Sequence, residues 1–438
     1  MKMTGVRFLS CAAIILPLAA RADVSLPSIV VDGMTQASDR AITITYSLEN
    51  GPAVVTLDIQ EKVDGQWRSI GEENIYGGTT RSCPQGDVSK VVDKSVGTIV
   101  WRPSDTLVSQ LSGKRQIRAA LTAWPLDDTP DYMAVSLLEG VSDGDRVRYY
   151  ASSNAVPGGV LGNPAYRTSH VLLRKIMAKD VVWTMGVTSE TGHGTGIRDA
   201  AHTAMLTNNF YIAVFPTTQA QWKSITSSKS ATLKVEGAMR AMESICFDAV
   251  RCCAVSDKKV EVGTEWPQPP YSQSWLGLLR NRTKLDFDLP GEGQWEFACR
   301  AGYGDGYWGT GAPITSKTDD PAFPGRFKYN QAIPENTTSD ASYGPENCTP
   351  IVGSYAPNAW GIYDQCGCVR EMCLDWSQND ISALNGLVNT TVGTKHIIRG
   401  GDWKSPASEA RPAFRDDGVP TAEAAYLGFR VVCRAGLK

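Results

Sequence analysis

The sequence predicts two folded domains behind an N-terminal leader: an all-β sandwich, then a glycine-rich domain with few regular elements. Short runs in which apolar and polar residues alternate fill residues 24–139. A stretch rich in glycine, proline, asparagine and serine follows at 150–167, and glycine and tryptophan are frequent beyond it. Such alternation is typical of half-buried strands, and such a stretch is typical of a linker. We therefore place a signal peptide at 1–22, the sandwich at 23–149, the linker at 150–167 and the second domain at 168–438.

The first residues have the pattern of a secretory signal peptide. Lys2 and Arg7 precede an apolar run at 8–18, and small residues surround the end of the segment at 20–22. This order is typical of a cleaved leader, and the run is too short to span the ~30 Å core of a bilayer. We expect a secreted, periplasmic or cell-surface protein with no membrane span. Lipidation at Cys11 is the alternative. It is disfavoured because most of the apolar run follows that cysteine instead of preceding it.

Composition narrows the classes of partner and the chemistry of the cysteines. The net charge is -3, and acidic and basic residues are mixed along the chain. A nucleic-acid-binding face needs clustered lysine and arginine, so we expect no nucleic-acid partner. The chain has 11 cysteines, of which only Cys11 falls within the leader. The remaining 10 cysteines are an even number, which in an oxidising compartment favours disulfides over free thiols. The connectivity of these disulfides cannot be deduced from sequence.

The first domain is predicted from its strands. Six runs carry the alternation and are rich in β-branched residues: SIVV, AITITYSLE, AVVTLDIQEKV, GTIVWR, RQIRAALTAW and YMAVSLL. Asp64-Gly65 follows the third run and suits the positive φ angles of a tight hairpin. The number and spacing of the runs predict an immunoglobulin-like or fibronectin-like sandwich. No cluster of catalytic residue types occurs in it, so we interpret it as a spacer.

The second domain is predicted to be irregular. Helices are expected at 218–224, 235–251, 274–280 and 292–300, with long irregular segments between them. A domain with many glycines and prolines and few continuous elements depends on side-chain staples, ions or disulfides for its stability. No repeat of fixed period is visible.

Ordered phrases in this second domain resemble one enzyme family. They are Trp183-Thr184-Met185-Gly186, Phe210-Tyr211-Ile212, Thr218-Gln219-Ala220-Gln221-Trp222, Met242-Glu243-Ser244-Ile245, LPGEGQWEFACRAG at 289–302, Val352-Gly353-Ser354-Tyr355, PNAWGIYD at 357–364, Arg399-Gly400-Gly401-Asp402-Trp403, Arg415-Asp416 and Gly428-Phe429-Arg430. The segment at 289–302 is similar to the family phrase LPTEAQWEYACRAG. From about residue 180 to 435 the chain thus resembles the formylglycine-generating, or sulfatase-modifying factor, enzymes.

The resemblance implies an irregular α+β domain related to the C-type-lectin-like fold, with bound calcium. Leu289-Pro290 suits a helix start, and Trp295 with Phe297 can supply core surface. Glu292 and Glu296 lie four apart on one helical face, which is compatible with paired acid–base carboxylates. Nothing else converges on them, so we interpret both as structural.

The resemblance also implies positions for calcium, a cation that prefers six to eight oxygen ligands. The family's ion takes a side-chain oxygen at the position of Asp364 and a carboxylate at that of Glu371. Backbone carbonyls at the positions of Gly367 and Val369 complete that set. A second family calcium uses residues that Asn330 and Gln331 resemble, and a loop asparagine with a structural role is the alternative there.

The family's catalytic cysteines are missing. In the enzymes two cysteines follow the Arg-Gly-Gly-x-Trp phrase and bind copper, which activates dioxygen to oxidise a substrate cysteine to formylglycine. Here Ser405 and Ala410 stand at those positions. Copper(I) prefers soft thiolate ligands, which a hydroxyl and a methyl group cannot replace, so we do not expect copper.

A further departure lies in the loop where the family reads His-Gly-Asn-Val-Trp-Glu-Trp. Here the phrase is CGCVREM at 366–372, and Cys373 follows. The three cysteines are compatible with a soft metal or a redox pair, although cysteines of an exported protein are more often disulfide-bonded. Adjacent Cys252-Cys253 leaves the same alternatives open. His193 lies in a glycine-rich string that we interpret as a loop, since no strand–turn–helix context for a phosphate cradle surrounds it.

Three functions are compatible with the sequence. The first is a calcium-stabilised, non-catalytic binding module for a protein or glycan ligand. The second is an oxidase of the formylglycine-generating type that uses other metal ligands, such as Cys366 and Cys368. The third is a cell-surface assembly component. Loss of the copper-binding pair favours the first.

Overall fold

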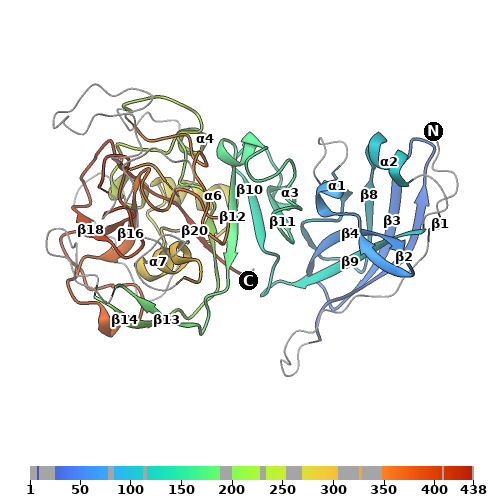
Figure 1. Cartoon of the computed structure of the whole chain (residues 1–438), viewed down its shortest axis with the longest axis horizontal. Helices are drawn as coiled ribbons and strands as arrows, with labels where there is room; N and C mark the ends of the chain where they lie inside the picture. Colours follow the sequence, from blue (N-terminus) through green and yellow to red (C-terminus); the bar gives the residue numbers. More distant parts are fainter. Residues whose placement is uncertain are drawn as a thin grey trace. The chain divides into compact units, whose positions relative to one another are not determined.

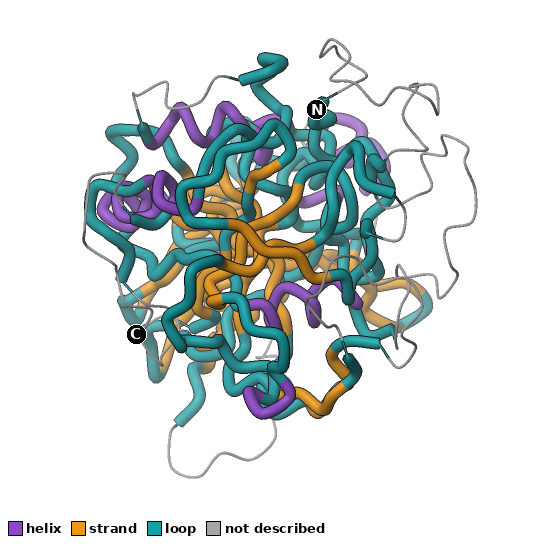
Figure 2. Tube along the Cα trace, turned by 90° about the vertical axis from the view of Figure 1, so that its left-hand side faces the viewer, coloured by secondary structure: helices purple, strands orange, loops and turns teal. Residues whose placement is uncertain are grey.

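The chain forms two compact units in the computed structural model (Figure 1). The structure describes residues 7–8, 25–76, 83–111, 116–187, 200–226, 233–252, 269–303, 325–327, 348–406 and 409–436. Unit 1 comprises residues 1–134, 142–163 and 435–438, and unit 2 comprises 135–141 and 164–434. Loops and turns make up much of the trace, and the helices are short (Figure 2). No helix among the described residues is long and apolar enough to cross a membrane.

Unit 1 is built from two sheets. One has the order β2 (Ser28–Gln36), β3 (Ile42–Glu49), β8 (Val96–Trp101), β6 (Gln85–Gly86). The other has the order β1 (Arg7–Phe8), β9 (Gln116–Pro125), β4 (Ala53–Val63), β5 (Gln66–Ser69), and β7 (Val91–Val92) also pairs with β4. The unit also holds α1 (Glu72–Tyr76), α2 (Asp105–Leu111), α3 (Asp143–Arg146) and β11 (Val147–Tyr150), while β10 (Tyr132–Ser136) lies where the chain passes between the units.

The strands predicted from alternation are confirmed. Each of the six runs forms a strand, and in β3 every second residue is buried. Asp64 and Gly65 have φ angles of 50° and 81° and connect Val63 to its pairing partner Gln66, so the predicted tight hairpin is confirmed. The immunoglobulin-like or fibronectin-like assignment of these sheets stays a prediction.

Unit 2 combines short strands with short helices. Strand β15 (Phe210–Ala213) lies between β12 (His170–Ile176) and β20 (Val432–Arg434); β13 (Val182–Met185) pairs with β14 (His202–Met205); and a third sheet has the order β18 (Arg415–Gly418), β17 (His396–Arg399), β16 (Arg370–Trp376), β19 (Leu427–Gly428). The helices are α4 (Gln219–Ile225), α5 (Phe247–Val250), α6 (Trp275–Thr283) and α7 (Glu292–Arg300), with 3-10 turns η1 (Pro164–Arg167) and η2 (Ser382–Leu384). The expectation of a domain with few helices is confirmed, and short strands supply much of its regular structure.

Three of the four helix predictions are confirmed and one is largely wrong. Helix α4 begins with a capping box, in which Thr218 Oγ1 accepts a hydrogen bond from Gln221 N at 3.2 Å and Gln221 Oε1 accepts one from Thr218 N at 2.9 Å. Such reciprocal bonds satisfy two free amides of the first turn. Of the helix predicted at 235–251, only α5 forms, because a turn at Gly237 and the left-handed backbone of Ser244 (φ 53°) interrupt the segment.

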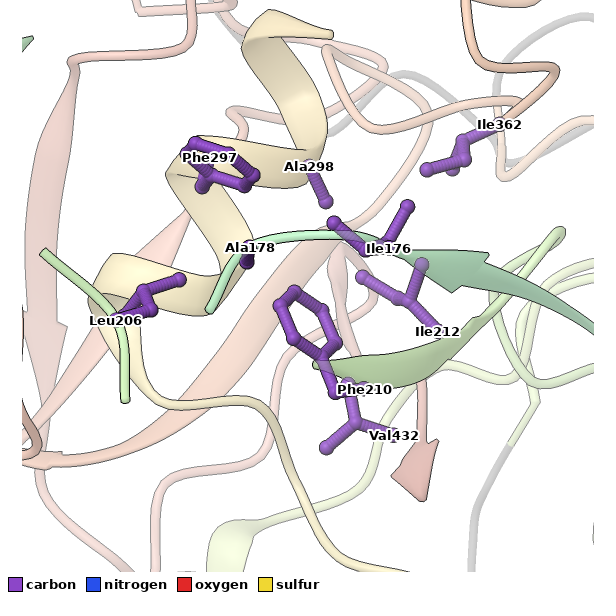
Figure 3. Packing of buried hydrophobic residues seen from close by; sticks show 9 residues of the cluster. All are labelled: Ile176, Ala178, Leu206, Phe210, Ile212, Phe297, Ala298, Ile362 and Val432. Atoms are coloured by element: carbon purple, nitrogen blue, oxygen red, sulfur yellow. The ribbon is translucent and has the colours of Figure 1, made fainter. Parts of the chain in front are cut away.

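Helix α7 lies at the centre of an apolar core in unit 2. Phe297 and Ala298 of this helix pack with residues of β12, β15 and β20 and of the segments outside these strands. Figure 3 shows Ile176, Phe210, Ile212 and Val432 from the strands and Ala178, Leu206 and Ile362 from outside them. Trp183 adds an edge-to-face contact with Phe297 at a ring-centroid distance of 5.2 Å. The apolar packing of α7 therefore fixes the positions of its buried carboxylates, those of Glu292 and Glu296.

His396 is stacked between two aromatic rings in the core of unit 2. Its ring lies 3.7 Å from that of Phe247 and 3.8 Å from that of Trp376, and Nδ1 donates to the carbonyl oxygen of Leu374 at 3.0 Å. Burial lowers the pKa of His396 from 6.5 to about 4.

A pH dependence of stability follows from His396. Between about pH 6.5 and pH 4 the unfolded chain takes up a proton that the folded chain does not, so the free energy of unfolding falls as the pH falls. We expect His396 to contribute about 3 kcal/mol to this fall by pH 4. In urea unfolding at both pH values, His396→Phe should keep the stacking and show a fall smaller by that amount; equal falls would contradict the assignment.

Candidate functional site

Two glycines shape the loop that follows β17. Gly400 and Gly401 have φ angles of 92° and 66°, a region that other residues rarely adopt. A Cβ atom on Gly400 would lie 2.5 Å from the carbonyl oxygen of Gln365, and one on Gly401 would lie 2.7 Å from that of Glu409. This tight loop brings Asp402 and Ser405 next to the start of β16.

Arg370 is the centre of a charged cluster at this loop. Its Nε donates to Asp402 Oδ2 at 2.6 Å, its Nη2 donates to Glu409 Oε2 at 3.0 Å, and its Nη1 donates to Asp416. Nη2 also donates to Ser405 Oγ at 3.1 Å. Burial alone would lower the pKa of Arg370, but the carboxylates of Asp402 and Asp416 outweigh it and raise the pKa. We call these five residues the Arg370 cluster.

The Arg370 cluster combines a buried base with a more open rim. The side chain of Asp402 is fully buried, whereas those of Glu409 and Asp416 are 28% and 27% exposed. Tyr426 covers one side, with its ring centroid 5.2 Å from the Arg370 guanidinium carbon. Three carboxylates and one guanidinium leave a formal excess of negative charge, so the rim can contact a polar or charged ligand.

The two positions of the family's cysteine pair have different surroundings. Ser405 is buried, and its Oγ lies 3.1 Å from Asp402 Oδ2 and 3.0 Å from Glu409 Oε2. Ala410 is completely buried in an apolar cluster that includes Trp295. The first position thus belongs to the Arg370 cluster and the second to the core, and neither supplies a thiol.

The cysteines of the CGC loop do not form a substitute pair. Cys366 Sγ lies 3.3 Å from Cys299 Sγ, whereas Cys368 Sγ lies 3.3 Å from Asp364 Oδ1. Burial raises the pKa of each of these loop thiols well above the usual range, as it does for Cys373. Within the described ranges, no three His, Cys, Asp or Glu side chains are grouped so as to hold a metal ion.

Six of the described cysteines have free thiols in this structure: Cys246, Cys299, Cys366, Cys368, Cys373 and Cys433. The expected disulfides therefore stay a prediction. Asn330, Gln331, His193 and Cys253 lie outside the described residues.

The residues of the first predicted calcium site lie close together but are already paired. Asp364 Oδ2 accepts a hydrogen bond from Gly353 N at 2.6 Å, and burial raises the pKa of Asp364 to about 6. Glu371 Oε2 accepts from Arg430 Nε and Trp295 Nε1, each at 2.7 Å, and its Oε1 accepts from Arg430 Nη2 at 2.7 Å. A calcium ion on Glu371 would have to displace these donors, so the residues as arranged do not fit the ion.

This arrangement gives an expectation for calcium. Arg430 already supplies the positive charge that Glu371 needs. We therefore expect 1 mM calcium chloride to leave the Tm within about 1 °C of its value in the presence of a chelator. A calcium site at a free calcium concentration of 100 times its Kd would instead raise the free energy of unfolding by about 2.7 kcal/mol. Differential scanning calorimetry measures both conditions. A calcium-dependent rise in Tm would show instead that the ion displaces Arg430.

Buried ion pairs connect the phrases singled out in the sequence. Glu292 Oε1 and Oε2 accept from Arg415, Glu296 accepts from Arg300 and Arg399, and Glu371 accepts from Arg430. All seven side chains are at least nine-tenths buried. The structural interpretation of Glu292 and Glu296 agrees with these contacts, because both carboxylates already have buried basic partners.

The Arg370 cluster was missed in the sequence, although one signal was present. Arg370 stands where the family phrase has tryptophan, and a charged side chain that is largely buried needs polar partners. Its partners come from positions 402, 409 and 416, and nothing in their spacing indicates that they meet at one side chain.

Comparison with known proteins identifies the family. The profile described as "Sulfatase-modifying factor enzyme 1-like domain" matches residues 172–435. The chain is 28% identical over 180 residues to "Formylglycine-generating enzyme" of Thermomonospora curvata, covering 38% of this chain and 56% of that protein. It is 28% identical over 182 residues to "Serine/threonine-protein kinase pkn1" of Chlamydia caviae, covering 40% and 24%. The chain thus spans about half or less of the length of these relatives.

Among solved structures, the chain is similar to "Treponema denticola variable protein 1", with a TM-score of 0.45 and 17% identity. The match covers 60% of this chain and 95% of that one. The family profile covers more than half of the chain, including α7, the Arg370 cluster and the ion pairs of unit 2. The chain belongs to the family of the sulfatase-modifying factor enzyme 1-like domain.

Proposed function

We propose that this protein is an exported, non-catalytic binding module of its family, which recognises a protein or glycan ligand through unit 2. The environments of Ser405 and Ala410 carry the proposal. Ser405 is held by Arg370, Asp402 and Glu409, and Ala410 is enclosed in the apolar core. Ser405 therefore contributes to a polar cluster and Ala410 to the apolar core, and neither side chain can bind copper.

The alternative is an oxidase of the formylglycine-generating type with other ligands for its metal. The relationship to the Thermomonospora curvata enzyme supports this alternative. Two soft thiolates would have to converge at an accessible position. Cys366 and Cys368 do not converge, and the two sulfurs that do, those of Cys299 and Cys366, are buried in an apolar cluster. Raised pKa values of the Cys366 and Cys368 thiols also work against thiolate formation, so the binding function is better supported.

The Arg370 cluster is the part of unit 2 that we propose contacts the ligand. Its rim offers the partly exposed carboxylates of Glu409 and Asp416. Lys404 Nζ lies 4.3 Å from the centroid of the Tyr426 ring, which adds a cation and an aromatic surface beside them. Charged groups beside a half-buried ring suit a ligand with both polar and flat apolar parts.

Asp416→Asn tests this proposal. The change removes one rim charge without uncovering the fully buried Asp402, so we expect a folded protein. A hydrogen bond to a charged group contributes about 1.5–3 kcal/mol, so ligand affinity should fall by roughly 10-fold or more. Glycan and peptide arrays with the wild-type protein identify a ligand, and calorimetric titration then compares the variants.

Asp417→Asn is the matched control. Asp417 is the next residue along β18, and it pairs with Lys395 and Ser377 outside the Arg370 cluster. We expect this variant to bind as the wild type does. Equal affinities of both variants would place the ligand elsewhere, and no ligand on any array would contradict the proposed function.

A further inference from the structure

Two cysteine sulfurs that are far apart in sequence meet inside unit 2. Cys299 Sγ and Cys366 Sγ are 3.3 Å apart, although 67 positions separate the residues. Cys299 lies in the last turn of α7, and Cys366 lies in the loop before β16. Both are buried in one apolar cluster with Trp295 and Ala410.

Other contacts hold both backbones at this spacing. Asn358 Nδ2 donates to the carbonyl oxygens of Ala298 at 2.8 Å and Cys299 at 3.3 Å. Gln365 Nε2 donates to the carbonyl oxygen of Trp295 at 3.2 Å. The chain before Cys366 is thus tied to α7 at two points. A disulfide has an S–S distance of about 2.0 Å, so the sulfurs need to approach by only about 1.3 Å.

We propose that Cys299 and Cys366 form a disulfide bond that joins the end of α7 to the loop before β16. The pairing is selective among the neighbouring cysteines. Cys368, two residues further on, places its sulfur near Asp364 Oδ1 and accepts from Arg326 N at 3.2 Å instead. This proposal is independent of the proposed binding function, since it concerns the apolar cluster that contains Ala410 and not the rim of the Arg370 cluster.

The bond forms by thiol–disulfide exchange with a small-molecule disulfide such as oxidised glutathione. The thiolate of one cysteine attacks that disulfide, releases one thiol and leaves a mixed disulfide on the protein. The second cysteine thiolate then attacks the protein sulfur of the mixed disulfide and releases the second thiol. The two cysteines lose two protons and two electrons, and the oxidant takes up both.

The reaction belongs to folding and not to the closed native state. Burial raises the pKa of Cys366 well above the usual range, and the adjacent Cys299 thiol adds to this effect. Because the thiolate is the reacting species, the closed protein should react slowly. During refolding both sulfurs are accessible to the oxidant until the core forms around them.

The test is a disulfide map of the full chain refolded from urea with reduced and oxidised glutathione. Free thiols are alkylated, the protein is digested without reduction, and the peptides are identified by mass spectrometry. We expect a linked peptide pair that contains Cys299 and Cys366. A folded protein with no such pair, or with Cys299 linked to any other cysteine, would overturn the proposal.

Variants assign the bond within the CGC loop, where only Gly367 separates the two candidate cysteines. Cys366→Ala should abolish the linked pair, whereas the matched control Cys368→Ala should retain it. Reduction should lower the Tm of the wild type and of Cys368→Ala by about 5–10 °C more than that of Cys366→Ala, as expected for a loop closed between residues 67 positions apart. A linked pair that survives in Cys366→Ala would also overturn the assignment.

Discussion

Arg430→Met is expected to lower the free energy of unfolding by about 3–5 kcal/mol, the cost of leaving a buried charge without its partner. Arg430 and Glu371 are both fully buried and joined by two hydrogen bonds of 2.7 Å. The guanidinium also donates to the carbonyl oxygens of Ala213 at 2.9 Å and Tyr363 at 2.8 Å. Methionine fills similar space but satisfies none of these acceptors.

Urea unfolding of three variants measures the effect. The double variant Arg430→Met with Glu371→Leu removes both charges and should recover part of the loss, because no buried charge is then left without its partner, although the carbonyl oxygens of Ala213 and Tyr363 still lack a donor. Lys395→Met breaks a pair at the surface with Asp417 and should cost less than about 1 kcal/mol. A loss of that small size in Arg430→Met would show that Glu371 has another counter-charge.

Arg399→Met is also expected to lower the free energy of unfolding by about 3–5 kcal/mol, because it leaves a buried carboxylate without one of its basic partners. Arg399 is completely buried, pairs with Glu296 and donates to the carbonyl oxygens of Ala413 at 3.0 Å and Phe414 at 2.7 Å. It therefore joins the end of β17 to α7 and to the segment before β18. Its loss leaves Glu296 with Arg300 and the amide of Gly186 as partners.

Chemical denaturation followed by tryptophan fluorescence measures this effect, since Trp295 lies 5.4 Å from the Arg399 guanidinium carbon. Arg399→Lys is the conservative comparison. Lysine keeps the charge but lacks the forked donors that reach the two carbonyls, so we expect an intermediate loss. Full stability of Arg399→Lys would mean that charge alone matters here, and full stability of Arg399→Met would contradict the role of the pair.

The elements of the fold could be predicted where a local signal exists. The strands of unit 1 follow from period-two alternation, and α4 follows from the capping pair Thr218 and Gln221. The segment 235–251 has a helical composition, but Gly237 and the left-handed Ser244 divide it, and tertiary contacts decided that outcome. Propensity is a weak guide when the surrounding structure sets the backbone.

The candidate site could be predicted only in part. The loss of thiols at positions 405 and 410 is visible in the sequence, because the phrase before them is intact. The partners of Arg370 come from three separate segments, and the approach of Cys299 to Cys366 depends on how the loop folds against α7. Contacts between distant positions require the structure.

Turnover is the direct test of the central claim that the protein is non-catalytic. The mature chain is incubated with copper(I), dioxygen and a Cys-x-Pro-x-Arg peptide, and conversion of the thiol to the aldehyde is followed by mass spectrometry. The formylglycine-generating enzyme of Thermomonospora curvata is the positive control. A thermal melt confirms that the chain under test is folded.

We predict no aldehyde above the control without protein, because Ser405 and Ala410 supply no thiolate to bind copper. Conversion that depends on the protein would contradict the account. It would direct attention to Cys366 and Cys368, whose replacement by alanine would then have to abolish it.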